Sequence, residues 1–283
     1  MKKRNGQMTI KQRFVKYVRR LVGYDHLQSK LDILIEILKK DMFAQQAQLK
    51  AQQAQLKKDL KEVNMALMFQ DVIKESAWLK YRDFAFGGYA IDYATAYTLF
   101  RVLNQMNPVS LLEFGLGQSS KLIHQYASYH HQFALTIEHS DEWVEFFLKD
   151  VGQRYPLNIK HSELKTVMFK GFETFTYDGL ELKLGDRKFD FVFVDGPYGF
   201  NDKGNLWYSR TQIIDVARNH LMDSFCIILH DYNREGEQRT AREVMDVLDN
   251  TGRKYLSKVV RSGARQHILI CSQDLSFVKT MCE

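Results

Sequence analysis

A glycine-rich turn framed by an acid and two serines is the segment of this chain best suited to binding a charged cofactor. The sequence LLEFGLGQSSK, Leu111–Lys121, predicts a buried strand, a tight turn and the start of a helix. Glycines allow the turn and let a ligand approach the backbone, and the helix start offers unpaired N–H groups. We expect these residues to bind the cofactor: Glu113, Gly115, Gly117, Gln118, Ser119 and Ser120.

The residues around this turn distinguish two classes of cofactor. A dinucleotide site prefers glycine or alanine at the third small position, where this chain has Ser120. Glu113 stands two residues before Gly115, and an anion there suits a positively charged ligand better than a pyrophosphate. Glu138 ends the next expected strand, where a carboxylate can accept both hydroxyls of a ribose. Glu138 would suit either class of cofactor. The alternative is that Glu138 is a solvated carboxylate at the end of a strand and binds no ligand.

Two further acids follow buried strands, at the end where ligands bind in open α/β sheets. Asp195 follows the first part of FDFVFVDGPYGF, and CIILHDYNREGEQR contains His230 and Asp231. We expect Asp195, His230 and Asp231 to be catalytic, with Asp195 or His230 as the general base, because a neighbouring acid can raise the basicity of a histidine. The alternative is that His230 is half-buried, has its hydrogen bonds satisfied within the protein and takes no part in catalysis.

Three residues on the loops after these strands are predicted to bind the substrate. Arg210 and Arg234 suit a carboxylate or a phosphate, unless they pair with Glu235 or Glu237. Tyr198 belongs to an aromatic loop that suits stacking on sugars or aromatic acceptors, although core packing is the commoner reason for such rings.

The elements that position these residues alternate between strands and helices. Apolar runs predict strands over Ser110–Phe114, Phe133–Glu138, Phe189–Asp195 and Phe225–His230. Amphipathic patterns predict helices over Ser119–Tyr129, Asp141–Val151, Ser209–Leu221 and Thr240–Asn250. The last two strands, Tyr255–Val260 and Gln266–Cys271, form a terminal antiparallel hairpin. The predicted fold is α/β, a Rossmann-like, doubly wound, mostly parallel sheet preceded by a long helical coiled-coil extension.

The pattern acid-x-Gly-x-Gly at the end of a first strand resembles the class I S-adenosylmethionine-dependent methyltransferases. The resemblance covers about Gly87 to Cys271 and extends to the stretches containing Asp195 and Asp231, which look like an O-methyltransferase-like subgroup. It implies S-adenosylmethionine as the cofactor and methylation of a sugar, glycan or small-molecule hydroxyl. The stretch Phe84–Tyr97 would cap the cofactor.

A divalent metal such as Mg²⁺ is a further expectation at Asp195 and Asp231, since two carboxylates can bind a cation that acidifies a hydroxyl. Similar O-methyltransferases complete such a site with an Asn beside the acid. Here Tyr232 follows Asp231 and Asn233 comes one residue later, which is a departure from that pattern.

The N-terminal part of the chain carries the excess positive charge. Residues 1–24 hold eight Lys or Arg and no acid, whereas the rest holds 32 basic and 34 acidic residues. We expect three parts, a basic amphipathic arm over residues 1–24, a helical coiled-coil segment over 25–80 and a methyltransferase domain over 81–283. The arm suits peripheral contact with an anionic membrane, or is simply a solvated or partner-packed helix.

The segment before the predicted domain contains the repeat AQQAQLK, which places Leu49, Leu56 and Val63 on one stripe. This spacing predicts a homo-oligomer through a coiled coil, and a single long charged helix is the alternative. The three cysteines show no metal-ligand spacing, and a reducing compartment fits them best. No apolar run reaches 18 residues, so no membrane-spanning helix is predicted. We therefore expect a cytoplasmic protein, with peripheral contact to the inner face of the membrane as the further option.

Three rival functions stay open at this point. An NAD-dependent oxidoreductase is opposed by Ser120 and Glu113. A non-catalytic coiled-coil scaffold with a vestigial domain is opposed by the retained turn and Glu138. Nucleic acid is not expected as a partner, because the part of the chain after residue 24 is nearly neutral.

Overall fold

The computed structural model describes residues 8–281 except residues 89, 262 and 264. Three of the eight basic residues counted in the N-terminal arm, Lys2, Lys3 and Arg4, and one of the three cysteines, Cys282, therefore lie outside the described residues. The chain divides into two units, residues 1–57 and residues 58–283, and each is described by itself.

The second unit is built on one seven-stranded sheet. Its strands in spatial order are β10 (Tyr255–Val260), β11 (His267–Ser272), β9 (Leu221–Leu229), β6 (Phe189–Val194), β1 (Ser110–Phe114), β2 (Phe133–Glu138) and β3 (Ile159–His161). The pairs from β9 through β6, β1 and β2 to β3 are parallel, whereas β11 runs antiparallel to both β9 and β10. The predicted fold class, a doubly wound and mostly parallel sheet with a terminal antiparallel hairpin, is confirmed.

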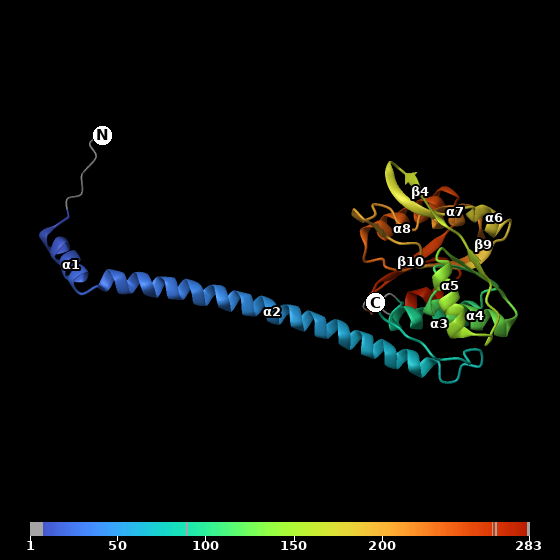
Figure 1. Ribbon diagram of the computed structural model, residues 1–283, viewed down its shortest axis with the longest axis horizontal. Coiled ribbons are helices and arrows are strands. Elements are labelled where there is room, and N and C mark those ends of the chain that lie inside the picture. Colours follow the sequence, from blue (N-terminus) through green and yellow to red (C-terminus); the bar gives the residue numbers. More distant parts are fainter. Residues whose placement is uncertain (1–7, 89, 262, 264, 282–283) are drawn as a thin grey trace. The chain divides into compact units, whose positions relative to one another are not determined.

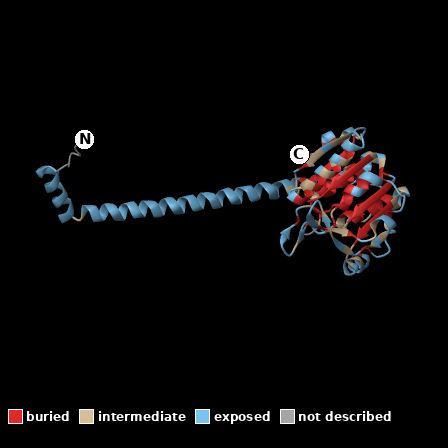
Figure 2. Ribbon diagram, turned by 90° about the horizontal axis from the view of Figure 1, so that it is seen from above, coloured by how far each residue is buried: buried red, intermediate tan, exposed pale blue. Residues whose placement is uncertain are grey.

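Alternate side chains of each central strand enter two separate hydrophobic cores, as the period of two in a strand requires. Leu111 of β1 packs with α3 (Tyr93–Met106) and α4 (Gln118–His130) on one face of the sheet. Leu112 packs with α7 (Gln212–Asn219) and α8 (Glu235–Asn250) on the other face, together with the short α6 (Leu180–Leu184). The strands are thus buried between two helical layers (Figures 1 and 2).

The edge of the sheet and its insertions are less regular. Helix α5 (Asp141–Val151) packs near β3 through Phe147. Two small hairpins stand outside the main sheet, β4 (Leu164–Phe169) with β5 (Phe172–Tyr177), and β7 (Phe200–Asn201) with β8 (Gly204–Asn205). A 3-10 turn, η1 (Ser276–Thr280), follows the last strand.

The first unit consists of α1 (Ile10–Leu21) and most of α2 (Tyr24–Val72), a helix of 49 residues. The last turns of α2 belong to the second unit, where Met65 and Phe69 are buried. That core also includes Ile73, Trp78 and Leu79, so it reaches well upstream of residue 81. Among the described residues, no helix combines the length and the apolar character that crossing a bilayer requires.

Candidate active site

The parallel register brings four strand ends to one edge of the sheet. Strand β1 pairs with both β2 and β6, and β6 pairs with β9. Their carboxyl ends therefore hold Glu113, Glu138, Asp195 and the pair His230–Asp231 along the same edge. The predicted cofactor residues and the predicted catalytic residues come from neighbouring strands of this edge.

Glu113 points into the protein interior. It is fully buried and accepts hydrogen bonds from the hydroxyls of Ser119 (2.6 Å), Ser120 (2.6 Å) and Thr136 (2.7 Å). Burial raises the pKa of this carboxyl to about 7, although the three hydroxyl donors oppose the shift. Glu113 and the two serines thus fix the turn from within, which differs from the direct ligand contact expected of them.

The two glycines of the turn serve different purposes. Gly115 has φ +93°, and a Cβ there would stand 3.0 Å from the backbone nitrogen of Gly196. The turn therefore packs directly on the Asp195–Gly196 backbone, and only glycine fits. Gly117 is extended, with φ −174°, and a Cβ there would meet no described atom within 4 Å. The space beside Gly117, at the start of α4, is open to a ligand.

Glu138 holds the outer side of the same turn. Its Oε2 accepts a hydrogen bond from the Leu116 backbone at 2.8 Å, and its Oε1 accepts from the backbones of His139 (2.6 Å) and Ser140 (2.9 Å). Burial alone would raise its pKa, but these donors and the adjacent His139 lower it overall, so the group is ionised. Among the described residues Oε2 accepts a single hydrogen bond, although the residue as a whole is only 4% exposed.

The strap, which we define as residues 81–88, is pinned along α4. Gln125 exchanges two hydrogen bonds with the backbone of Tyr81, Lys121 donates to the carbonyl of Asp83 at 2.9 Å, and Gln118 accepts from the Ala85 nitrogen at 3.1 Å. Gln118, Lys121 and Gln125 share one face of the helix because they are three and four residues apart. Gln118 thus holds the strap through its side-chain oxygen.

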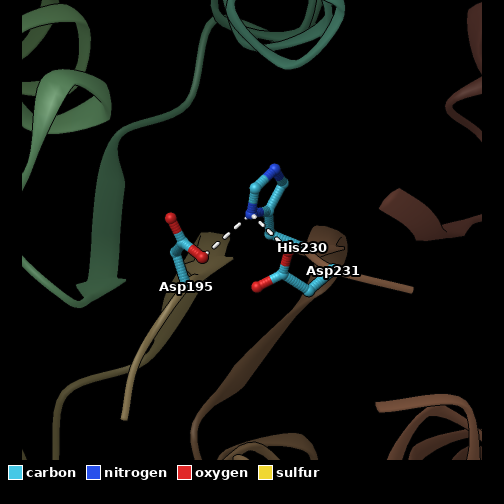
Figure 3. Close-up of side chains that lie close together, drawn as sticks. All are labelled: Asp195, His230 and Asp231. Carbon is cyan, nitrogen blue, oxygen red and sulfur yellow. Dashed lines mark hydrogen bonds and ion pairs between the residues drawn. The ribbon is translucent and has the colours of Figure 1, made fainter. Parts of the chain in front are cut away.

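Asp195 and His230 form a dyad. Nδ1 of His230 lies 2.9 Å from Oδ1 of Asp195 and 3.8 Å from Oδ1 of Asp231. Figure 3 shows both carboxylates at this nitrogen, while the other ring nitrogen, Nε2, points away from them. Nε2 is buried and has no hydrogen-bond partner among the described residues. The arrangement fixes Nδ1 between the two acids and leaves Nε2 without a partner among the described residues, because the His230 ring is fully buried.

The carboxylates change the proton affinity of His230. Burial lowers its pKa, but the charges of Asp195 and Asp231 and the hydrogen bond to Asp195 outweigh that effect, and the pKa is raised above 6.5. The pKa of the buried His267 shifts the opposite way, to about 3, because burial and the charge of the nearby His230 outweigh the charge of Asp92. His230 is therefore the better base of the two.

Three arginines surround Asp231. Its Oδ2 lies 2.9 Å from Arg210 and 3.0 Å from Arg234, and its Oδ1 lies 3.0 Å from Arg265. Burial opposes ionisation, but His230 and the three guanidinium groups lower the pKa of Asp231 to about 2. Asp231 is a permanent anion that holds the arginines together.

These arginines decide how well the site suits a metal. Asp195, His230 and Asp231 each offer one ligand atom within 4.8 Å of the others, which is close enough for a divalent cation. Both oxygens of Asp231 are already occupied by guanidinium groups, and Arg210 also lies 3.2 Å from Asp195. Cationic side chains repel a cation at such distances. The donor set therefore does not fit the metal expected at Asp195 and Asp231.

The structure gives the three predicted substrate residues different surroundings. Arg210 is buried, and besides its two aspartates it donates to the carbonyl of His230 at 2.9 Å. It braces the dyad from inside the protein. Arg234 is partly exposed, and Tyr198 is half-exposed, with its ring edge-on to His139 at 4.6 Å.

Two further residues complete the site, and the sequence carries no clear signal for the first of them. Arg265 comes from the turn between β10 and β11, and it joins Asp231 to the carbonyl of Gly88 in the strap. Glu237 of α8 is buried near Arg210 (3.8 Å) and Arg234 (3.5 Å). The sequence does place Glu237 next to the arginine-bearing loop, which is the pairing raised above as the alternative for Arg234.

No protein-family model and no curated protein sequence matches this chain. Solved structures similar to it include an O-methyltransferase from Bacillus cereus in complex with SAH, at 11% identity and a TM-score of 0.46 over 76% of this chain and 92% of that one. A methyltransferase from Pyrococcus furiosus matches at 14% identity and a TM-score of 0.42, over 74% of this chain and 96% of that chain.

An SAH-bound methyltransferase from Podospora anserina matches at 10% identity and a TM-score of 0.41, over 75% of this chain and 88% of that one. Each of these three proteins is described as a methyltransferase or an O-methyltransferase. At these identities the similarity concerns the fold alone, so the activity has to be argued from the residues of this chain.

Proposed function

We propose that this protein is an S-adenosylmethionine-dependent methyltransferase that acts on a hydroxyl group. The observation that carries the proposal is the contact between Gly115 and the Asp195–Gly196 backbone. It joins the turn predicted to hold the cofactor to the residue that orients His230. A cofactor site and a base for the acceptor are therefore neighbours on one edge of the sheet.

The residues around the turn fit the cofactor. The open side of Gly117 leaves room at the start of α4, and Glu138 keeps an ionised oxygen that accepts a single hydrogen bond among the described residues. When bound, S-adenosylmethionine supplies a methyl group on a positively charged sulfonium. Gly117, Leu116 and Glu138 would hold it, and Tyr198 beside His139 would flank it.

His230 is the group that would accept the proton of the acceptor hydroxyl. Nε2 faces away from both acids and is unpartnered among the described residues, so its lone pair is free to take this proton. The ring is fully buried, so the side chains that cover Nε2 have to move aside for the acceptor. Asp195 holds the ring through Nδ1 and stabilises the imidazolium that forms. Arg210 fixes Asp195 in turn, from a distance of 3.2 Å.

The acceptor that we favour is a sugar or glycan hydroxyl. Tyr198 and Phe200 follow β6 and are each about half-exposed, at 49% and 48%, so their rings can stack on a sugar face. Trp207 is less suited, because Phe172 stacks on it at 4.9 Å and Arg239 lies 3.5 Å above its ring. The activity assay is transfer of a labelled methyl group to a panel of glycosides, with small phenols as the comparison.

Gly117→Val is the sharpest test of the cofactor site. The backbone at residue 117 is extended and the Cβ position is free of described atoms, so the variant is expected to keep its melting temperature. Calorimetric titration should show that it loses most of its affinity for S-adenosylmethionine. Gln153→Val, on the exposed turn after α5, is the control for adding a branched side chain. Unchanged cofactor affinity in Gly117→Val, or binding of NAD in place of S-adenosylmethionine, would overturn the proposal.

A further inference from the structure

Helix α1 forms an amphipathic surface that no part of the second unit's chemistry uses. Thr9 and Gln12 cap its start reciprocally: the Gln12 nitrogen donates to the Thr9 hydroxyl at 3.3 Å, and the Thr9 nitrogen donates to the Gln12 side chain at 2.9 Å. Arg19 and Arg20 lie in the last turn, where they complement the negative end of the helix dipole. The helix is therefore well specified by its own residues.

The two faces of α1 differ completely in chemistry. At 100° per residue, one side carries Ile10, Phe14, Val18 and Leu21, and the other carries basic side chains. The apolar side chains are open to solvent, with Ile10 89%, Phe14 67% and Leu21 70% exposed. The basic side holds Arg13, Lys16, Arg19 and Arg20.

The charge of residues 1–24 helps to decide which partner covers the apolar face of α1. Residues 1–24 contain no Asp or Glu, so a second copy of α1 could cover the apolar face but would offer no acid to the basic face. A nucleic acid would neutralise the basic face and leave the apolar face in water. An anionic bilayer surface satisfies both faces at once, because the apolar side enters the acyl boundary while the basic side meets the headgroups.

A groove beside α1 adds to this basic surface. It has a volume of about 750 Å³ and lies between α1 and the start of α2. Lys11, Lys16 and Arg19 line it, and Asp25 is the single acid of its lining. A phosphate-bearing headgroup finds several cations within reach there.

We infer that α1 is an in-plane anchor that binds the protein to the surface of anionic phospholipid bilayers. The inference does not depend on the enzymatic activity, since it rests on α1 and the groove alone. Each basic residue near an anionic surface contributes roughly a fivefold gain in affinity at low salt. Replacing one large apolar side chain on the face of α1 that enters the bilayer should lower the affinity for vesicles further.

The test is flotation of the full-length protein with vesicles of phosphatidylcholine alone or of phosphatidylcholine and phosphatidylserine in a 7:3 ratio. We expect binding to the mixed vesicles only, weakened by raising the salt concentration. Ile10→Glu should reduce this binding at least tenfold. Leu182→Glu is the matched control, because Leu182 is equally exposed (90%) on a helix of the second unit, and it should bind like the unchanged protein.

Three outcomes would overturn the inference. One is the absence of binding to mixed vesicles, and another is equal binding to neutral vesicles. The third is a change of oligomeric mass in Ile10→Glu with vesicle binding preserved, which would identify a second copy of the chain as the occupant. Ile10→Glu is not expected to affect folding of the second unit because α1 has no buried residue, and Leu182→Glu is not expected to because Leu182 is 90% exposed.

Discussion

Nδ1 of His230 lies 2.9 Å from Oδ1 of Asp195, although the two residues are 35 positions apart and follow different strands. The contact exists because β6 and β9 are parallel neighbours whose carboxyl ends are aligned. It determines which nitrogen of the imidazole is occupied and which one is free. The pairing of β6 with β9 therefore determines which nitrogen of His230 can act as the base, and the residues next to His230 in the sequence do not.

The dyad predicts a particular pH dependence. The pKa of His230 is raised above 6.5, and a base must be deprotonated, so the methylation rate should rise with pH through that raised value. Asp195→Asn removes the charge that raises it, and the acid limb of the kcat/KM profile should move to lower pH. His230→Gln should reduce kcat by about 10²- to 10⁴-fold. A profile for Asp195→Asn that coincides with that of the unchanged enzyme would contradict the dyad.

Arg210 is expected to matter for stability more than for substrate affinity. It is buried, it contacts Asp195 and Asp231, and its removal would leave buried carboxylates without a counter-charge. Arg210→Met should lower the free energy of unfolding by about 3–5 kcal/mol, as measured by urea denaturation. Arg242→Met, on the exposed side of α8, is the control and should cost little. Equal stability of the two variants would show that Arg210 does not brace the site.

Glu113 should make stability fall as pH rises. Its pKa is about 7 in the folded protein against an ordinary value of 4.5, so the folded state binds the proton more tightly than the unfolded state. Between these two pH values the free energy of unfolding therefore decreases, by a total of about 3 kcal/mol. Glu113→Gln should flatten this slope in thermal melts recorded from pH 4.5 to 7.5, whereas the exposed Glu163→Gln should keep it. A slope that persists in Glu113→Gln would contradict this assignment.

Removal of divalent metal should leave methyl transfer unchanged. The arginines around Asp231 occupy its oxygens and oppose a second cation. The measurement is the initial rate in the presence of EDTA, compared with the rate after Mg²⁺ or Mn²⁺ is restored. Loss of activity in EDTA followed by recovery with either ion would favour the metal site that the two carboxylates suggest.

Helix α2 is expected to join copies of the chain. Leu49 and Leu56 are 55% and 68% exposed, and they repeat at seven residues on one stripe. Light scattering should report an oligomer for the full chain and a smaller mass for the double variant Leu49→Glu, Leu56→Glu. The double variant Lys50→Glu, Lys57→Glu introduces acids next to this stripe and should keep the mass of the unchanged protein. A monomer at all concentrations would contradict the prediction.

Strand positions were predictable because buried strands of a parallel sheet appear as short apolar runs. The bounds Ser110–Phe114 and Phe133–Glu138 match β1 and β2, and Tyr255–Val260 matches β10. Helix α3 and the β4–β5 hairpin were not predicted. Most residues of α3 are buried, so no exposed polar face indicates its helical period, and β4 mixes partly buried and exposed residues without strict alternation.

The side-chain directions at the site were harder to predict than the strands. Glu113 was expected to face the cofactor, but three hydroxyls from two elements hold it inside. Arg265 reaches Asp231 from a turn 34 residues away, and nothing near either residue in the sequence indicates that pairing. The spacing of Gln118, Lys121 and Gln125 did contain a usable signal, a polar stripe on an otherwise buried helix.

The final turns of α2 have a practical consequence for dissecting this protein by truncation. Phe69 is fully buried against the rings of Phe84 and Phe86, and Trp78 stacks on Phe100 at 5.1 Å. A chain shortened to begin at residue 81 would lose Phe69 and Trp78 and expose the apolar surface they cover. Large aromatic deletions of this kind cost about 3–5 kcal/mol each. A separable catalytic fragment should therefore start near Lys58, so that it retains the last turns of the helix.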